Sequence, residues 1–224
     1  MNLKKLKQAE ASFLANYPKG FGDPEIKEMV KKHNLNRMIV QIQESFVKVN
    51  FKNSRVIADD MVRHIGRSSM ISLYEKPKFR ELVKSLNYAE IEALCSGFRN
   101  MLHGEKKIGF EMVLSILQSR KLAKWSLLTI LPVYFHPHDE VFVKPTTAKR
   151  VIEYFELSDL QYRPQPNWEF YEAYRRQILD MASHVSPSLS PNNAAFTGFL
   201  MMSLGSLKIW RDKTEKSYSA NPRL

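Results

Sequence analysis

The chain has 224 residues, of which 44% are hydrophobic and 25% charged. These values are typical of a globular protein, so they exclude disordered and fibrous classes. Lysine and arginine number 34 against 23 aspartates and glutamates, which gives a formal net charge of +11. A basic balance favours anionic partners, such as nucleic acid or a phosphorylated or acidic group, through long-range attraction.

The apolar runs are too short to cross a bilayer, and the longest of them, residues 127–135, contains Thr129 and Pro132. The basic start at residues 1–7 is not followed by an apolar segment, so it does not resemble a signal peptide. We therefore predict a cytoplasmic protein without membrane contact. Cys95 is the only cysteine, which excludes an intramolecular disulfide and predicts a buried structural thiol on an apolar helix face.

The first third of the chain reads as helices separated by clear breaks. A helical stripe that begins at Leu3 ends in the loop over residues 16–22, where a proline and two glycines occur. Asp23 and Pro24 then restart a helix, with Asp as the N-cap and Pro at the first helical position. Further helices are predicted beyond residue 38 and up to Gly66, which follows the last apolar residue of that pattern.

The middle and the end of the chain are also predominantly helical in pattern. Asn87 and Glu90 have the spacing of a capping box, followed by helices on both sides of Gly104. We expect His64 and His103 to serve as cations near helix C-termini. A helix entered at Pro145 is also predicted over residues 148–157, and an aromatic-rich helix begins at Gln165 or Asn167. The last helix, predicted over residues 194–209, is apolar nearly all round.

Strand signals are few. Residues 134–135 and 141–143 are short apolar segments that are predicted to pair as one small hairpin. The predicted fold is therefore mostly α: an irregular multi-helix bundle with at most one short β-hairpin. We expect a single helical domain over residues 1–224, with residues 1–50 as an outer helical layer and residues 211–224 as a frayed tail.

Residues 134–150 hold an unusual density of histidines, carboxylates, prolines, threonines and cations. In an extended segment His136 and His138 face the same side, so both can reach one metal ion, with Asp139 and Glu140 completing the shell. This pattern predicts a metal site that would serve a metal-dependent hydrolase. The alternative is an ordinary polar loop, which often collects the same residue types.

The second half of this stretch predicts an anion site at the start of a helix. Backbone amides of a first helical turn and nearby cations suit a phosphate or a carboxylate, and the alternative is plain capping by Thr146. Arg163, in a proline-rich loop with Tyr162 and Trp168, is an added candidate. The residues of this predicted anion site are Lys144, Thr146, Thr147, Lys149, Arg150 and Arg163.

Residues 142–149, together with residues 162–168, resemble the C-terminal part of a family of uncharacterised bacterial proteins with a Phe-x-Lys-Pro-x-x-x-Lys signature. The loop over residues 17–24 is similar to that family's N-terminal Pro-Gly-Gly-Phe-x-Asp-Pro turn, with Lys19 in place of a glycine. Residues 193–199 depart from the family's Asp-x-x-Ser-Phe-x-Trp pattern. The resemblance implies a bacterial, intracellular protein, and it transfers no activity.

Three functions follow from these patterns. The favoured one is a non-enzymatic binding or adaptor protein with an anionic ligand or partner, either nucleic acid or a phosphorylated or acidic group. The alternatives are a helical protein-interaction subunit and a metal-dependent hydrolase centred on His136, His138, Asp139 and Glu140. No Gly-rich phosphate loop and no Ser-His-Asp pattern occurs in the sequence, so we assign no catalytic residue and expect no cofactor.

Overall fold

Over the residues that it describes, 1–205, the chain folds entirely into helices and connecting loops, without a strand. This computed structural model describes every side chain in that range except the one at position 32. Ten α-helices are joined by four short 3-10 helices and followed by a helix over residues 193–205. The elements are α1 (Leu3–Asn16), η1 (Gly20–Gly22), α2 (Pro24–Val30), η2 (Lys31–His33), α3 (Leu35–Ser45), η3 (Lys48–Lys52), α4 (Ser54–Arg67), α5 (Glu75–Ser85), α6 (Tyr88–His103), α7 (Lys106–Ser119), α8 (Trp125–Phe135), α9 (Pro145–Tyr154), α10 (Trp168–Ser183) and η4 (Pro187–Leu189).

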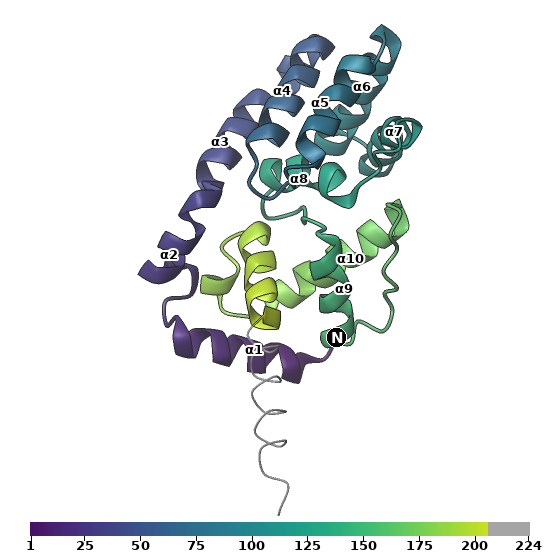
Figure 1. Cartoon of the computed structure of the whole chain (residues 1–224). Helices are drawn as coiled ribbons and strands as arrows, with labels where there is room; N and C mark the ends of the chain where they lie inside the picture. The colour runs from purple at the N-terminus through teal and green to yellow at the C-terminus, as the bar shows by residue number, and fades with distance from the viewer. Residues whose placement is uncertain (206–224) are drawn as a thin grey trace, which may run out of the picture.

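The helices form two halves (Figure 1). The upper half holds α4 to α8, with α6 and α7 as an antiparallel pair. The lower half holds α1, α9, α10 and the helix over residues 193–205, and α2 and α3 rise along one edge between the halves. The mostly α multi-helix bundle predicted from the sequence is confirmed.

Local capping explains where several helices begin. Asn87 accepts a hydrogen bond from the Glu90 amide at 3.0 Å, and Glu90 accepts one from the Asn87 amide at 2.9 Å, which is the predicted capping box. Asp23 caps α2 with Pro24 at the first position, as the sequence indicates. The Asn167 side chain caps α10 by accepting a hydrogen bond from the Phe170 amide at 2.9 Å.

The predicted hairpin is wrong. Residues 134–135 form the end of α8, and residues 141–143 are buried loop rather than strand. The Val143 amide, which a hairpin would pair with a strand, instead donates to the Thr129 hydroxyl at 3.0 Å. Because α8 is buried nearly all round, tertiary packing outweighs the strand preference of these short apolar segments.

The first 45 residues lie along the outside of both halves (Figure 1). In α1, the buried Phe13 packs edge to face against Phe199, with ring centroids 5.3 Å apart, and the Asn2 amide donates to the Phe155 carbonyl at 2.7 Å. α3 packs against α4 and α8 instead. The predicted tail over residues 211–224 lies outside the described residues.

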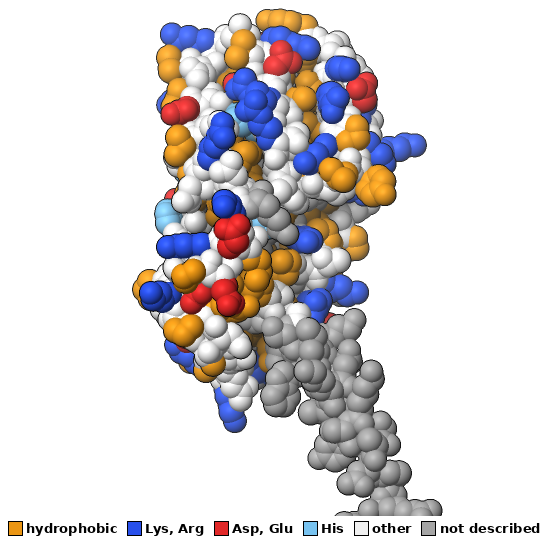
Figure 2. Space-filling view, turned by 60° about the vertical axis from the view of Figure 1, so that its left-hand side comes forward, with side chains coloured by type: hydrophobic (Ala, Val, Ile, Leu, Met, Phe, Trp, Pro, Cys, Tyr) orange, Lys and Arg blue, Asp and Glu red, His pale blue; other side chains and the backbone are white. Residues whose placement is uncertain are grey.

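One hydrophobic core runs through the described chain. Its buried side chains come from α1 through to the helix over residues 193–205, with Leu6 and Leu204 near its two ends in the sequence. Lysines and arginines do not form a separate face in Figure 2, where they are spread over upper and lower parts among acidic and hydrophobic side chains. Among residues 1–205, no helix has the length and the apolar character that crossing a bilayer needs.

Candidate anion-binding site

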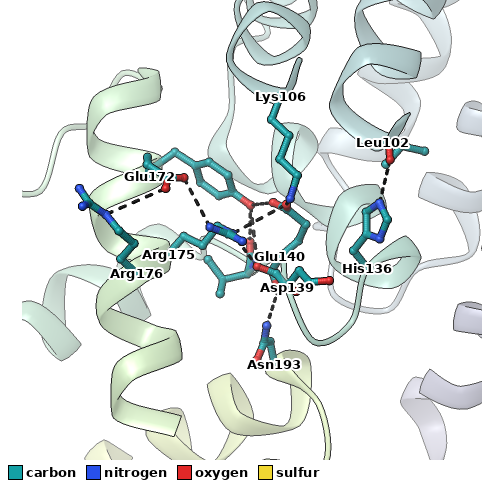
Figure 3. A network of polar contacts seen from close by, with 11 residues as sticks. Leu102, Lys106, His136, Asp139, Glu140, Glu172, Arg175, Arg176 and Asn193 are labelled. Carbon is teal, nitrogen blue, oxygen red and sulfur yellow. Dashed lines mark hydrogen bonds and ion pairs between the residues drawn. The ribbon is translucent and has the colours of Figure 1, made fainter. Parts of the chain in front are cut away.

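The loop between α8 and α9 places Glu140 at the centre of a buried polar network (Figure 3). Glu140 is only 3% exposed. Its carboxylate pairs with Lys106 Nζ from α7 at 2.5 Å and accepts a hydrogen bond from the Tyr171 hydroxyl of α10 at 2.5 Å. Arg175 Nε lies 3.8 Å from the same carboxylate. Glu140 therefore joins α7 of the upper half to α10 of the lower half.

The Glu140 network fixes the position of the loop between α8 and α9. Burial, with the adjacent Glu140 carboxylate, raises the pKa of Tyr171 well above its usual range, so the phenol remains a hydrogen-bond donor at neutral pH. Asn193 fixes the backbone of this loop as well. Its side-chain Nδ2 donates to the Glu140 carbonyl at 2.9 Å, and its backbone N–H donates to the Pro137 carbonyl at 2.8 Å.

The four residues of the predicted metal site do not converge. His136 Nε2 is hydrogen-bonded to the Leu102 carbonyl at 2.8 Å, His138 and Asp139 are exposed, and Glu140 is held by Lys106 and Tyr171. The described part of the chain contains no group of three or more His, Cys, Asp or Glu side chains arranged to hold a metal ion. The segment is an anchor between helices in this structure.

The start of α9 is the centre of the predicted anion site. Lys144 is the N-cap residue and Pro145 the first helical residue, and no side chain caps the first turn. Thr146, the predicted plain cap, therefore does not fill this role. Uncapped amides at a helix N-terminus carry partial positive charge and attract anions.

Thr147 provides a second, independent feature at the same place. The residue is only 5% exposed, yet its hydroxyl makes no hydrogen bond with any residue that the structure describes. The hydroxyl is not among the fully buried polar atoms that lack a partner, so it is accessible and can donate a hydrogen bond to a ligand or accept one. This hydroxyl lies in the wall of a cavity of about 200 Å³.

Four of the six predicted anion-site residues line that cavity. They are Lys144, Thr146, Thr147 and Arg150, and they face Met201 and Leu204 of the last described helix. Arg150 also donates to the Leu204 carbonyl at 2.6 Å, which ties the two helices together beside the cavity. We name this group, with the first-turn amides of α9, the α9 anion site.

Lys149 and Arg163 lie outside the α9 anion site. Lys149 lines a separate depression with Tyr162 and Pro164, because two residues along a helix from Thr147 the side chain points to the other side. Arg163 is exposed, and its carbonyl accepts a hydrogen bond from Trp125 Nε1 at 2.7 Å. The residue therefore anchors its loop through the backbone.

Sequence reasoning missed a second cavity, of about 320 Å³, beside the α9 anion site. Lys144, Thr147 and Met201 line both cavities. Most of the other wall residues are apolar and come from segments far apart in the sequence: Phe21, Met29, Val30, Leu35, Met70, Phe142, Ala194, Ala195, Gly198 and Met202. Polar groups are His33, Ser69 and Thr197, and His33 Nδ1 is hydrogen-bonded to Ser69 Oγ at 2.8 Å.

Neither cavity has a carboxylate among its described wall residues. Lys144 and Arg150 are therefore not neutralised by acidic side chains at these surfaces.

Two other candidates from the sequence are structural. Burial raises the pKa of the Cys95 thiol to about 12, so the predicted structural thiol is confirmed and a thiolate is absent at neutral pH. His64 is not the expected cation: burial, with repulsion from Arg63 and Arg67, lowers the pKa of His64 to about 4. Its neutral ring is hydrogen-bonded through Nε2 to Ser45 Oγ at 2.8 Å.

Comparisons of the chain with protein-family models, with curated proteins and with solved structures each found no match. The resemblance of residues 142–149 to an uncharacterised family thus stays a prediction.

Proposed function

We propose that this chain is a non-enzymatic binding protein for a small oxyanion, either a phosphate or a carboxylate, held at the α9 anion site. Lys144 would supply the opposite charge, and the Thr147 hydroxyl and the first-turn amides of α9 would supply hydrogen bonds. The observation that carries the proposal is the Thr147 hydroxyl, which has no hydrogen-bond partner among the described residues, at a cavity beside an uncapped helix start.

A small ligand fits these observations better than a nucleic acid does. Nucleic acids are held by cations that track several phosphates along an extended surface. Here the cations are interspersed with acidic groups on the face seen in Figure 2, while the α9 anion site is a cavity of about 200 Å³. One such cavity accommodates a single phosphate or carboxylate group.

Calorimetric titration with inorganic phosphate tests this function. We expect Lys144→Gln to weaken phosphate binding about tenfold, because a charge-assisted hydrogen bond contributes about 1.5 kcal/mol. Thr147→Val keeps the side-chain shape and removes the hydroxyl, and it should weaken binding about fivefold, since a neutral hydrogen bond contributes about 1 kcal/mol.

Lys149→Gln is the matched control, because Lys149 lies on the same helix but outside the cavity. The phosphate affinity of the Lys149→Gln variant should stay within about twofold of the wild-type affinity. Equal phosphate affinity in wild type, Lys144→Gln and Thr147→Val would refute the α9 anion site. Tight binding of a single-stranded oligonucleotide that survives Lys144→Gln would favour a nucleic-acid partner instead.

A further inference from the structure

The two cavities beside α9 differ in chemistry but share part of their walls. The α9 anion site has cations, threonines and helix amides. The second cavity, which we name the methionine cavity, is lined mainly by apolar side chains, four of them methionines: Met29, Met70, Met201 and Met202. Lys144, Thr147 and Met201 belong to both, so the two spaces adjoin.

The methionine cavity has the size and the flexibility of a site for a small apolar group. Its volume of about 320 Å³ lies at the lower end of the roughly 300–1,000 Å³ typical of ligand sites. Methionine side chains are unbranched and adapt to irregular shapes. Hydrophobic side chains also gather in the lower half of the face that Figure 2 brings forward.

We infer that the ligand is an amphipathic anion, a phosphate or carboxylate head group that carries a short alkyl chain. The inference rests on the proposed function, since the head group would occupy the α9 anion site, with its chain in the methionine cavity. The charged head group of such a ligand matches the cations of the α9 anion site, and its alkyl chain matches the apolar walls of the adjoining methionine cavity. Lys144 and Thr147 lie at the boundary where the charged head joins the chain.

The walls of the methionine cavity also indicate what such a ligand would do to the fold. Met29 belongs to α2, Met70 follows α4, and Gly198 belongs to the last described helix. A bound chain would therefore contact elements of both halves and of the edge between them. Binding should stabilise the folded chain, and at a fixed ligand concentration well above Kd the gain should rise with the logarithm of the affinity.

A homologous series of alkyl phosphates tests the inference. Methyl, butyl, hexyl and octyl phosphate, each below its micelle-forming concentration, would be titrated into the full chain by calorimetry. We expect affinity to rise by up to about fourfold for each added methylene, the ratio for burying one such group, until the cavity is full. A thermal-shift series with the same compounds should follow the same order.

Gly198→Leu separates the two sites. A Cβ at Gly198 would meet the Phe21 ring at 3.6 and 3.9 Å, which is ordinary contact, and leucine favours a helix over glycine. The leucine side chain should occupy the methionine cavity, so the gain with chain length should disappear while methyl phosphate binding stays within about twofold. Ala194→Leu, at another wall position, should give the same pattern.

Lys144→Gln provides the complementary result. It should weaken every compound in the series by a similar factor and leave the ratio per methylene unchanged. Equal affinity for methyl and octyl phosphate in the wild type would overturn the amphipathic ligand while leaving the oxyanion function standing. Methyl phosphate binding unaffected by Lys144→Gln would refute the α9 anion site itself.

Discussion

At the residue scale, Glu140 shows how a reactive-looking residue can be structural. Its place after two histidines and an aspartate suggested a metal ligand, yet the carboxylate is buried between Lys106 and Tyr171. Thr147, by contrast, does line a cavity at its predicted site. It lies in a predicted helix start, and its hydroxyl has no hydrogen-bond partner among the described residues.

Replacing Lys106 should measure what the Glu140 network contributes. Lys106→Met would leave a buried carboxylate with Tyr171 and the more distant Arg175, so we expect a loss of about 2 kcal/mol in the free energy of unfolding. This value lies below the roughly 3–5 kcal/mol for a fully buried pair, because the Lys106 side chain is 38% exposed. Urea denaturation at neutral pH would measure it.

Lys107→Met is the control for that experiment. Lys107 follows Lys106 in α7 but pairs with the exposed Glu111 and Glu169. Its loss should change the free energy of unfolding by less than about 0.5 kcal/mol. If both substitutions changed the free energy of unfolding equally, the ion pair of Lys106 with Glu140 would contribute no more to stability than an exposed pair.

At the element scale, helix positions followed from the sequence but helix contacts did not. Periodicity and the Asn87 capping box predicted α6, whereas its close packing with α7 depends on two glycines facing each other. A Cβ at Gly109 would lie 2.4 Å from the Met101 amide nitrogen and 2.5 Å from the Gly97 carbonyl oxygen. Only the absence of a side chain permits this approach.

Gly109→Ala should therefore destabilise the protein, although alanine is the better helix former. The clash is with backbone atoms, which cannot move without separating α6 from α7, so we expect a loss of about 2–3 kcal/mol in the free energy of unfolding. Gly66→Ala is the matched control in α4, where a Cβ would meet nothing within 4 Å. That change should stabilise the helix by about 0.5–1 kcal/mol. Thermal unfolding of the two variants compares them, and a neutral Gly109→Ala would contradict the close packing.

At the scale of the whole molecule, the loop over residues 136–143 links the two halves. The sequence pattern predicts one bundle without such a division. The Glu140 network and the bonds of Asn193 to residues 137 and 140 connect elements from both halves. The core is continuous as well. We therefore expect the two halves to unfold as one cooperative unit.

Hydrogen exchange can check this cooperativity. Phe13→Leu loosens the contact of α1 with Phe199 in the lower half and should lower the free energy of unfolding by about 1–2 kcal/mol. If the halves unfold together, the slowest amides of α6 in the upper half should lose as much protection as those of α10. Unchanged protection in α6 with reduced protection in α10 would show separate unfolding of the halves.

The sequence alone determined the helical class, the caps at Asp23 and Asn87, and the helix entered at Pro145, because these depend on residues within one or two turns of each other. Only the tertiary structure decided which polar residues are structural and which line a cavity. It separated Lys149 and Arg163 from Lys144 and Thr147, and it assembled the methionine cavity from segments between Phe21 and Met202. No local pattern encodes such a cavity, since its walls adjoin only after the core has packed.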